Sequence, residues 1–360
     1  MERIKVGIIG CGNISGIYFE NAKRFSSLEL VACADLDVER AKAKGIEHGV
    51  QGCSVQELLD DSTIGLVLNL TIPQAHAEVA RLSLEAGKHV YLEKPLAVTR
   101  EEAASILKLA DEKGLRVGCA PDTFLGGGIQ TCIKLIQEGA IGVPTGAAAF
   151  MLCGGHESWH PAPEFYYKLG GGPMFDMGPY YLTALVAMLG PIKRVTASTR
   201  ISFAERLITS EPKAGEKITV DVPTHIAGIM DFASGLIGTI TTSFDVFGGS
   251  DVPRIEVYGS EGTLSVPDPN SFGGPVKLKR RGAEGWEEIT LTHGNADNSR
   301  GIGAADMVEA ILEGRPHRAS GELASHVLEV MHGFHDAALE GRHYQMRSTC
   351  ATPAPMPTGV

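Results

Sequence analysis

Short apolar runs alternate with amphipathic stretches along the first 120 residues of the chain. The runs are nearly continuous in apolar character, as buried parallel strands are, and the stretches between them have helical spacing. Thr99 before Glu101 and Gly114 after Lys113 are typical helix-end signals. The expected strands are 4–9, 28–34, 64–71, 89–92 and 115–120, and the expected helices include 37–48, 75–86 and 100–113. This order predicts a doubly wound α/β domain with helices on both faces of a parallel sheet.

The rhythm changes after Pro121. Helices are expected at 131–138 and 176–189, and the chain from 194 to 291 is mainly of β character, with turns at 233–235 and 260–262. Two more helices are expected at 302–313 and 323–340. The pattern predicts an α+β domain with a large open, mainly antiparallel sheet. We place the domains at 1–121 and 122–360.

Composition narrows the class of protein. Hydrophobic residues make up 43% and charged residues 21%, which is ordinary for a soluble globular chain. A net charge of −11 argues against a broad nucleic-acid surface. We expect neither export nor membrane insertion, since no signal-like segment or 18-residue apolar run is present. The seven cysteines are widely spaced and form no CxxC pair, which argues against a disulfide framework or zinc ribbon. The expected compartment is the cytoplasm.

A glycine-rich turn joins the first strand to a helix, in the run Val6-Gly7-Ile8-Ile9-Gly10-Cys11-Gly12-Asn13-Ile14-Ser15. In a Rossmann fold the first glycine makes the tight turn and the second lets the backbone approach a pyrophosphate at the helix N-terminus. Gly10 and Gly12 fit these positions. Ser15 takes the third and is small enough for close packing.

Asp35 ends the second strand, 23 residues after Gly12, where a carboxylate accepts hydrogen bonds from the adenosine ribose. No basic residue follows at once, and Leu36-Asp37 does not suit a 2′-phosphate. NAD is therefore predicted over NADP. The alternative is a structural glycine turn with an unrelated surface aspartate.

Further motifs follow in a set order. They are Glu93-Lys94-Pro95 after the strand 89–92, the loop from Thr71 to His76, the turn 139–142, the run Gly-Gly-Gly-Pro-Met-Phe-Asp-Met-Gly at 170–178, and the segment from Gly314 to His326. With them the chain resembles the glucose–fructose oxidoreductase and inositol dehydrogenase family (Gfo/Idh/MocA) over nearly its whole length. The resemblance implies cofactor contacts from Gly10, Cys11, Gly12, Asn13, Ile14, Asp35, Thr71, His76, Glu93 and Lys94.

The resemblance also implies that Lys94 lies beside the nicotinamide, bonds the reacting oxygen and precedes a cis peptide at Pro95. A cation there favours a developing alkoxide. The alternative is a surface lysine in a turn. In the second domain many relatives carry an aspartate followed four residues later by histidine. Here Asp176 matches and Tyr180 replaces the histidine, one helical turn away. Tyr180 is a candidate base or substrate contact if an ammonium such as Lys94 lowers its pKa; the alternatives are a core tyrosine and, for Asp176, a helix cap.

The loop His156-Glu157-Ser158-Trp159-His160-Pro161 is a second substrate candidate. Its polar tips and aromatic faces suit a polyhydroxylated ligand, with His156, Trp159 and His160 as contacts. The alternative is an aromatic loop packed at a domain interface. The prolines disfavour a helix there and no third ligand is evident, so no metal site is predicted.

Three departures from the family pattern concern specificity. Thr71-Ile72-Pro73 shifts a proline by one position, Asp122-Thr123-Phe124 stands where an Arg-Phe pair is common, and Tyr180 replaces histidine. The predicted function is NAD-dependent oxidation of a hydroxyl on a sugar, cyclitol or sugar derivative, with Lys94, Asp176 and Tyr180, or a loop histidine, as catalytic groups. The alternatives are NAD-assisted elimination or glycoside cleavage without net redox, and a ligand-sensing regulator. A carbohydrate or polyol is the expected partner, and the resemblance implies a homodimer or homotetramer.

Overall fold

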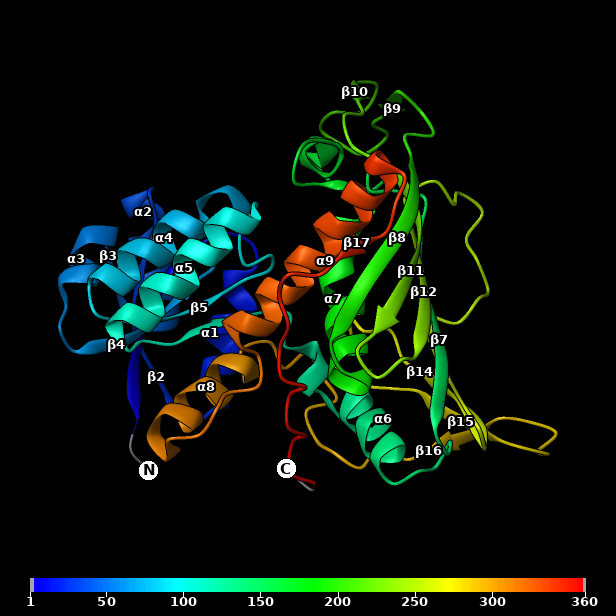
Figure 1. Ribbon diagram of the computed structural model, residues 1–360. Helices are drawn as coiled ribbons and strands as arrows, with labels where there is room; N and C mark the ends of the chain where they lie inside the picture. The colour runs from blue at the N-terminus through cyan, green and yellow to red at the C-terminus, as the bar shows by residue number, and fades with distance from the viewer. Residues whose placement is uncertain (1–2, 359–360) are drawn as a thin grey trace. The chain divides into compact units, whose positions relative to one another are not determined.

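The computed structural model describes residues 3–358, and these divide into two units (Figure 1). Unit 1 comprises residues 3–125 and 298–328, and unit 2 comprises 126–297 and 329–358. The expected division at residue 121 lies four residues before the first break. It did not include the return of 298–328 to unit 1, because that segment follows the β-rich region without a change in composition that would mark it.

Unit 1 is built on a parallel sheet of six strands in the order β3-β2-β1-β4-β5-β6. The strands are β1 (Ile4–Ile9), β2 (Leu28–Ala34), β3 (Gln51–Cys53), β4 (Ile64–Asn69), β5 (His89–Leu92) and β6 (Val117–Cys119). The predicted doubly wound domain is confirmed. Strand β3 escaped the sequence pattern because it has only three residues, of which Cys53 alone is buried.

The helices of unit 1 are α1 (Ser15–Ala22), α2 (Val38–His48), α3 (Val55–Asp60), α4 (Pro73–Glu85), α5 (Arg100–Lys113), the short 3₁₀ turn η1 (Thr123–Leu125) and α8 (Ile302–Glu313). Helix α5 has the predicted bounds. It begins with a capping box in which the Thr99 side chain accepts from the Glu102 N–H, and it ends at the left-handed Gly114.

Unit 2 is built on a nine-stranded sheet in the order β16-β15-β14-β13-β7-β12-β11-β8-β17, plus a separate two-stranded ribbon of β9 and β10. Only the β7–β12 pair is described as parallel, so the sheet is mainly antiparallel as predicted. Its strands are β7 (Pro144–Leu152), β8 (Ile192–Arg200), β11 (His225–Phe232), β12 (Ile237–Ser243), β13 (Ile255–Gly259), β14 (Gly262–Val266), β15 (Val276–Arg280), β16 (Glu287–Ile289) and β17 (Tyr344–Gln345); the ribbon is β9 (Glu205–Leu207) and β10 (Lys217–Thr219).

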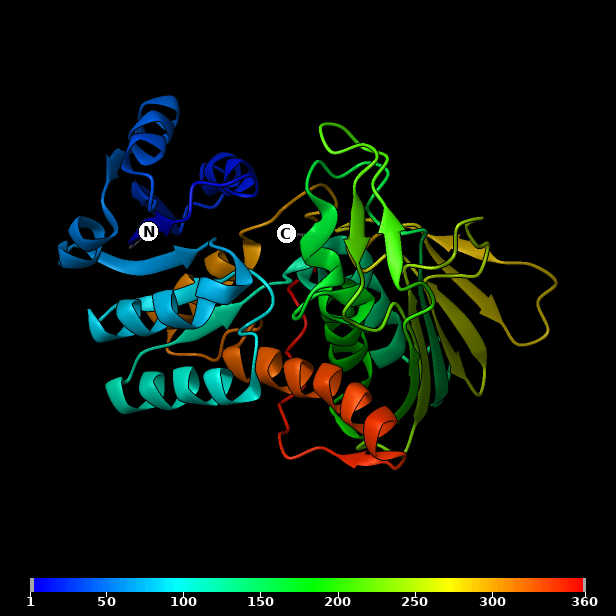
Figure 2. The same cartoon turned by 90° about the horizontal axis from the view of Figure 1, so that it is seen from above.

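Helices cover one face of this sheet. They are α6 (Gly127–Gln137), α7 (Gly172–Leu189) and the C-terminal part of α9 (Gly321–Glu340), visible on the same side in Figures 1 and 2; the 3₁₀ turn η2 (Pro163–Tyr167) precedes α7. Phe334 of α9 lies so close to Gly228 of β11 that a Cβ there would be 2.5 Å from its ring. The opposite face is open: Ile229 and Ile237 are 44% and 56% exposed.

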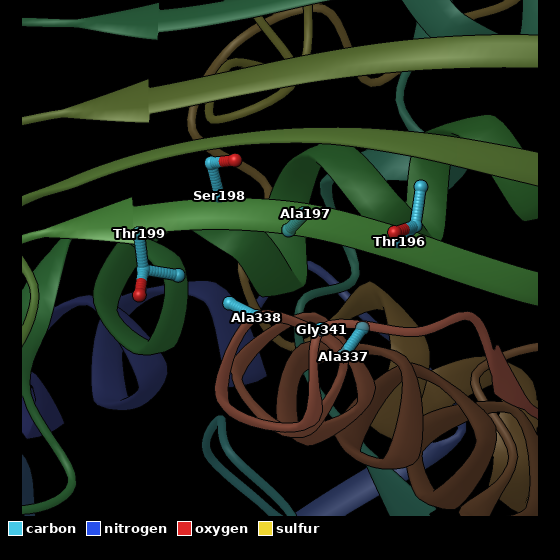
Figure 3. Close-up of a pocket in the computed structure, with 7 residues that line it drawn as sticks. All are labelled: Thr196, Ala197, Ser198, Thr199, Ala337, Ala338 and Gly341. Carbon is cyan, nitrogen blue, oxygen red and sulfur yellow. The ribbon is translucent and has the colours of Figure 1, made fainter.

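A hollow of about 380 Å³ lies between β8 and the end of α9 (Figure 3). Small side chains leave this space open, and it is lined by Thr196, Ala197, Ser198, Thr199, Ala337, Ala338 and Gly341. Because no lining side chain carries a charge or an acid–base group, the hollow does not suit the predicted chemistry. Among the described residues no helix is both long and apolar enough to cross a membrane.

Candidate active site

The glycine turn of unit 1 has the backbone that dinucleotide binding needs. Gly10 has φ +104°, and a Cβ there would lie 2.7 Å from the carbonyl of Leu70, so no other residue fits. A Cβ on Gly12 would meet nothing within 4 Å, which leaves its backbone open to a ligand. The Ser15 hydroxyl donates to the Gly12 carbonyl at 2.7 Å, and Ser15 is fully buried. The turn therefore fits a pyrophosphate at the start of α1.

The Asp35 carboxylate lies beside this turn. It accepts from the Cys11 N–H at 2.8 Å and from the Asp37 N–H at 3.0 Å. Arg40 is 3.5 Å away and also pairs with Asp37 at 3.6 Å. The sequence motif does not point to Arg40, although its place three residues after the Asp37 N-cap of α2 puts it on the first helical turn. Leu36 is 97% exposed.

His76 ties the Thr71 loop to the Lys94 turn. Its Nδ1 lies 2.7 Å from the carbonyl oxygen of Pro95 and its Nε2 lies 3.0 Å from that of Thr71. The ring is fully buried, and burial lowers its pKa although the two carbonyls act in the opposite direction. The implied cis peptide between Lys94 and Pro95 is confirmed. His76 thus positions the loops that carry Thr71 and Lys94, and its ring nitrogens are already occupied.

Half-buried Glu93 and fully buried Asp122 are neighbouring acidic residues of unit 1. Glu93 accepts from the Tyr18 hydroxyl at 2.7 Å and from the Lys94 N–H at 3.0 Å. Asp122 accepts from the N–H groups of Gly301 and Gly303 at 2.8 and 3.0 Å, at the start of α8. Burial, assisted by the Glu93 charge, raises the pKa of Asp122 to about 6. Asp122, where the sequence departs from the family pattern, therefore accepts from the first N–H groups of α8, which lie 179 and 181 residues later in the chain.

In unit 2 the structure pairs His156 with Asp176. The Nε2 atom of His156 lies 3.0 Å from Oδ2 of Asp176. Helix α7 begins at Gly172, so Asp176 lies in its second turn and the alternative of a helix cap is wrong. Rings surround the imidazole, with Tyr166 at 4.0 Å, Phe244 at 4.7 Å and Trp159 at 5.3 Å between centroids. Its Nδ1 is buried and has no hydrogen-bond partner among the described residues.

The other substrate candidates lie around this pair. Tyr180 is one turn beyond Asp176 on α7 and 8% exposed. Trp159 is 60% exposed. His160 uses Nδ1 to accept from the Ala162 N–H at 3.0 Å, so this nitrogen is occupied by the backbone. Among residues 3–358 no group of three or more His, Cys, Asp or Glu side chains is arranged to hold a metal ion.

The sequence reasoning missed the residues that hold the His156 loop. The Arg206 guanidinium on β9 donates to Glu157 at 2.6 Å and to Asp245 at 2.7 Å. The Tyr167 hydroxyl also donates to Glu157. Arg206 is 49 residues from Glu157 and 39 from Asp245, and Tyr167 is 10 residues from Glu157, so no short motif relates them. We refer to Arg206, Glu157, Asp245 and Tyr167 as the Arg206 network.

Family models match both units. Residues 4–120 match the oxidoreductase family with an NAD-binding Rossmann fold, and residues 129–265 match the Gfo/Idh/MocA C-terminal domain. The chain belongs to the Gfo/Idh/MocA oxidoreductase family. Its first unit is accordingly an NAD-binding Rossmann domain.

Relatives and solved structures agree with this assignment. The chain is 25% identical to levoglucosan dehydrogenase of Pseudarthrobacter phenanthrenivorans over 292 residues, which covers 73% of each protein. It is 25% identical to myo-inositol 2-dehydrogenase of Thermotoga maritima, over 72% of this chain and 74% of the relative. An NAD-binding oxidoreductase from Klebsiella pneumoniae has the same fold, with a TM-score of 0.83 and 22% identity over 95% of this chain and 99% of that structure.

Proposed function

We propose that the protein is an NAD-dependent dehydrogenase that oxidises a hydroxyl group of a sugar, cyclitol or sugar derivative. The observation that carries the proposal is the pairing of His156 with Asp176 in unit 2, in a chain whose unit 1 is an NAD-binding domain. Oxidation of a C–H bond next to a hydroxyl requires a group that removes the hydroxyl proton, and a carboxylate-paired imidazole is such a group. The names of the two relatives supply the substrate class.

Unit 1 carries the groups proposed to bind the cofactor. The open backbone at Gly12 and the carboxylate of Asp35 are the groups that would hold the pyrophosphate and the adenosine ribose. NAD, when bound, supplies the hydride acceptor. Lys94 follows β5 in the turn that His76 positions, and we propose that its ammonium stabilises negative charge on the reacting oxygen.

Unit 2 carries the proposed acid–base pair. A neutral imidazole that donates its Nε2 hydrogen to Asp176 keeps its lone pair on Nδ1. This lone pair is the proposed acceptor of the hydroxyl proton. Asp176 stabilises the imidazolium that results, as the aspartate of a catalytic triad does. We propose that a substrate reaches Nδ1 by displacing the exposed Trp159 ring, which lies edge-on to His156. Tyr180 then serves as a buried neighbour of the pair.

The open face of the nine-stranded sheet is the proposed site of self-association. It exposes Ile229 and Ile237, together with short residues such as Ala227 and Thr239. Exposed apolar surface of this kind on a soluble chain favours a protein partner, and the family resemblance implies a second copy. A molecular mass of one chain at micromolar concentration would contradict this part of the proposal.

A screen of NAD⁺ reduction across free sugars and cyclitols tests the function. We expect net NADH with at least one monosaccharide or cyclitol. Product analysis of the same reactions distinguishes the other reading, because elimination or glycoside cleavage consumes substrate without net NADH. No turnover of any carbohydrate in either assay would overturn the proposal.

A further inference from the structure

A buried cation lies behind the loop that carries His156. The Arg206 side chain is only 3% exposed, and its charge is met by Glu157 and Asp245, whose side chains are 11% and 7% exposed. Its two Nη2 hydrogens go to the carbonyls of Gly154 at 2.7 Å and Phe244 at 3.0 Å. A buried ion pair is costly unless such additional bonds satisfy both partners. Here one guanidinium bonds the chain on both sides of His156, at Gly154 before it and at Glu157 after it.

The network extends from Arg206 to the backbone of His156. The Tyr167 hydroxyl donates to Glu157 and accepts from the His156 N–H at 3.4 Å. Burial and the bond to Glu157 raise the pKa of Tyr167, so its hydroxyl stays protonated and remains a donor. The Glu157 carbonyl accepts from the N–H groups of Thr209 and Ser210 at 2.9 and 3.1 Å. The residue next to His156 is therefore fixed through both its backbone and its side chain.

The far side of the network is fixed to the main sheet. Asp245 follows β12 and accepts from the Thr224 hydroxyl at 2.7 Å. Arg206 belongs to the β9–β10 ribbon, which is not part of the nine-stranded sheet. The exposed ring of Phe247 lies over its guanidinium at 4.8 Å. The ribbon, the sheet and the His156 loop thus meet at one side chain.

We propose that Arg206 and Tyr167 are positioning residues that hold His156 in the orientation in which it bonds Asp176. The catalytic consequence rests on the proposed function, whereas the structural consequence does not. Loss of the network leaves the loop able to move, and the imidazole then spends less time at 3.0 Å from the carboxylate. A displacement of about 1 Å at a reacting group can lower a rate about 100-fold.

The chain carries its own reporter of loop order. It has two tryptophans, Trp159 in the loop and Trp286 beyond β15, so Trp286→Phe leaves Trp159 as the single tryptophan. In this background Tyr167→Phe removes one hydroxyl and keeps the ring. We expect a larger nanosecond component in the anisotropy decay of Trp159 than in the parent. Arg206→Lys keeps the charge but loses the fork of donors, and should act in the same direction.

Tyr344→Phe is the matched control, because the Tyr344 hydroxyl also donates to a buried glutamate of unit 2, Glu329, at 2.9 Å. It should lower thermal stability without changing the Trp159 anisotropy. With a substrate that the parent enzyme oxidises, Tyr167→Phe and Arg206→Lys should each lower kcat about 10- to 100-fold, with a much smaller change in KM. Anisotropy and kcat equal to those of Tyr344→Phe would overturn the proposal. Because the anisotropy needs no substrate, a parent enzyme inactive on every carbohydrate contradicts the proposed function alone.

Discussion

The two units place their functional groups in different ways. In unit 1 distant residues meet because adjacent parallel strands end at one edge of the sheet. Asp35, after β2, accepts a hydrogen bond from the N–H of Cys11, after β1. His76, after β4, bonds the carbonyl of Pro95 in the turn after β5. In unit 2, His156 and Asp176 come from an irregular loop and a helix. Their pairing relies on side chains such as Arg206 rather than on strand ends.

This difference bears on how easily each group of residues can be replaced. A cofactor half-site made from strand ends and glycine turns depends on backbone geometry, so it tolerates few changes and reads as a motif. The proposed acid–base pair of unit 2 is made from side chains, and such a pair can exchange one imidazole for another. Here Tyr180 occupies the helix position of the usual histidine, and His156 supplies the imidazole that bonds Asp176.

Lys94→Ala should have the largest effect. Removal of a charge-stabilising group lowers kcat by about 10²–10⁴-fold, whereas NADH affinity should change little because the pyrophosphate and adenosine are held by the glycine turn and Asp35. Steady-state kinetics and NADH fluorescence titration measure the two effects. Lys108→Ala, at a side chain that is 79% exposed, is the matched control. A Lys94→Ala variant with normal kcat would mean that the lysine is only a turn residue.

His156→Ala compared with Tyr180→Phe tests the substrate half. We expect His156→Ala to lower kcat by about 10²–10³-fold, since it removes the proposed proton acceptor, and Tyr180→Phe to retain most activity because the ring still fills its buried site. The opposite ranking, with Tyr180→Phe nearly inactive at every pH, would return the base to the helix as the sequence reasoning first placed it.

Sequence reasoning predicted the parts of the molecule that local rules determine. The bounds of α5 follow from Thr99 and Gly114, and the two-unit α/β plus open-sheet architecture follows from the change of period after Pro121. The pairing of His156 with Asp176 was not predicted, because it depends on where a loop without regular spacing lies. The return of residues 298–328 to unit 1 was missed because no change in composition marks it, and the contact that ties it there joins Asp122 to Gly301 across 179 positions.

Asp122→Asn should remove a pH dependence of stability from unit 1. The pKa of this buried aspartate rises from 3.8 to about 6 on folding, so the folded chain binds the proton more tightly than the unfolded chain. The contribution of Asp122 to the free energy of unfolding is therefore fully present below about pH 4 and falls as the pH rises to about 6. The fall amounts to about 3 kcal/mol, at about 1.4 kcal/mol per pH unit. The asparagine amide oxygen can still accept from Gly301 and Gly303.

Urea unfolding at pH 4, 5, 6 and 7 measures this effect. It is followed by circular dichroism, because both tryptophans lie in unit 2 and their fluorescence would not report the unfolding of unit 1. The free energy of unfolding of Asp122→Asn, relative to the parent, should increase with pH over this window. Other titrating groups are common to both proteins and cancel. Parallel curves would show that Asp122 is ionised throughout and that its two N–H donors offset its burial.

A change in cofactor preference should be the smallest effect. It tests whether one side chain, Asp35, selects the cofactor in a unit whose other cofactor groups belong to the backbone. NADH should bind more tightly than NADPH because the Asp35 carboxylate, held by the N–H groups of Cys11 and Asp37, repels a 2′-phosphate. Asp35→Ser combined with Leu36→Arg removes that charge and adds a cation at a fully exposed position. The preference should shift toward NADPH by about 10- to 100-fold, the worth of one or two charged hydrogen bonds. Fluorescence titration of both reduced cofactors measures it.

Arg40 makes this prediction sharper. Its guanidinium lies 3.5 Å from Asp35 and 3.6 Å from Asp37, so in the parent its charge is shared between two carboxylates. Arg40→Ala in the parent should therefore leave NADPH affinity low and nearly unchanged. In the Asp35→Ser, Leu36→Arg variant, Arg40 has lost its pairing with Asp35 and is available to the 2′-phosphate of NADPH. Arg40→Ala added to that variant should therefore reduce the NADPH affinity that it gained. Equal affinity of the parent for NADH and NADPH, abolished by Arg40→Ala, would instead show that Arg40 already serves as a phosphate ligand and that Asp35 does not select the cofactor.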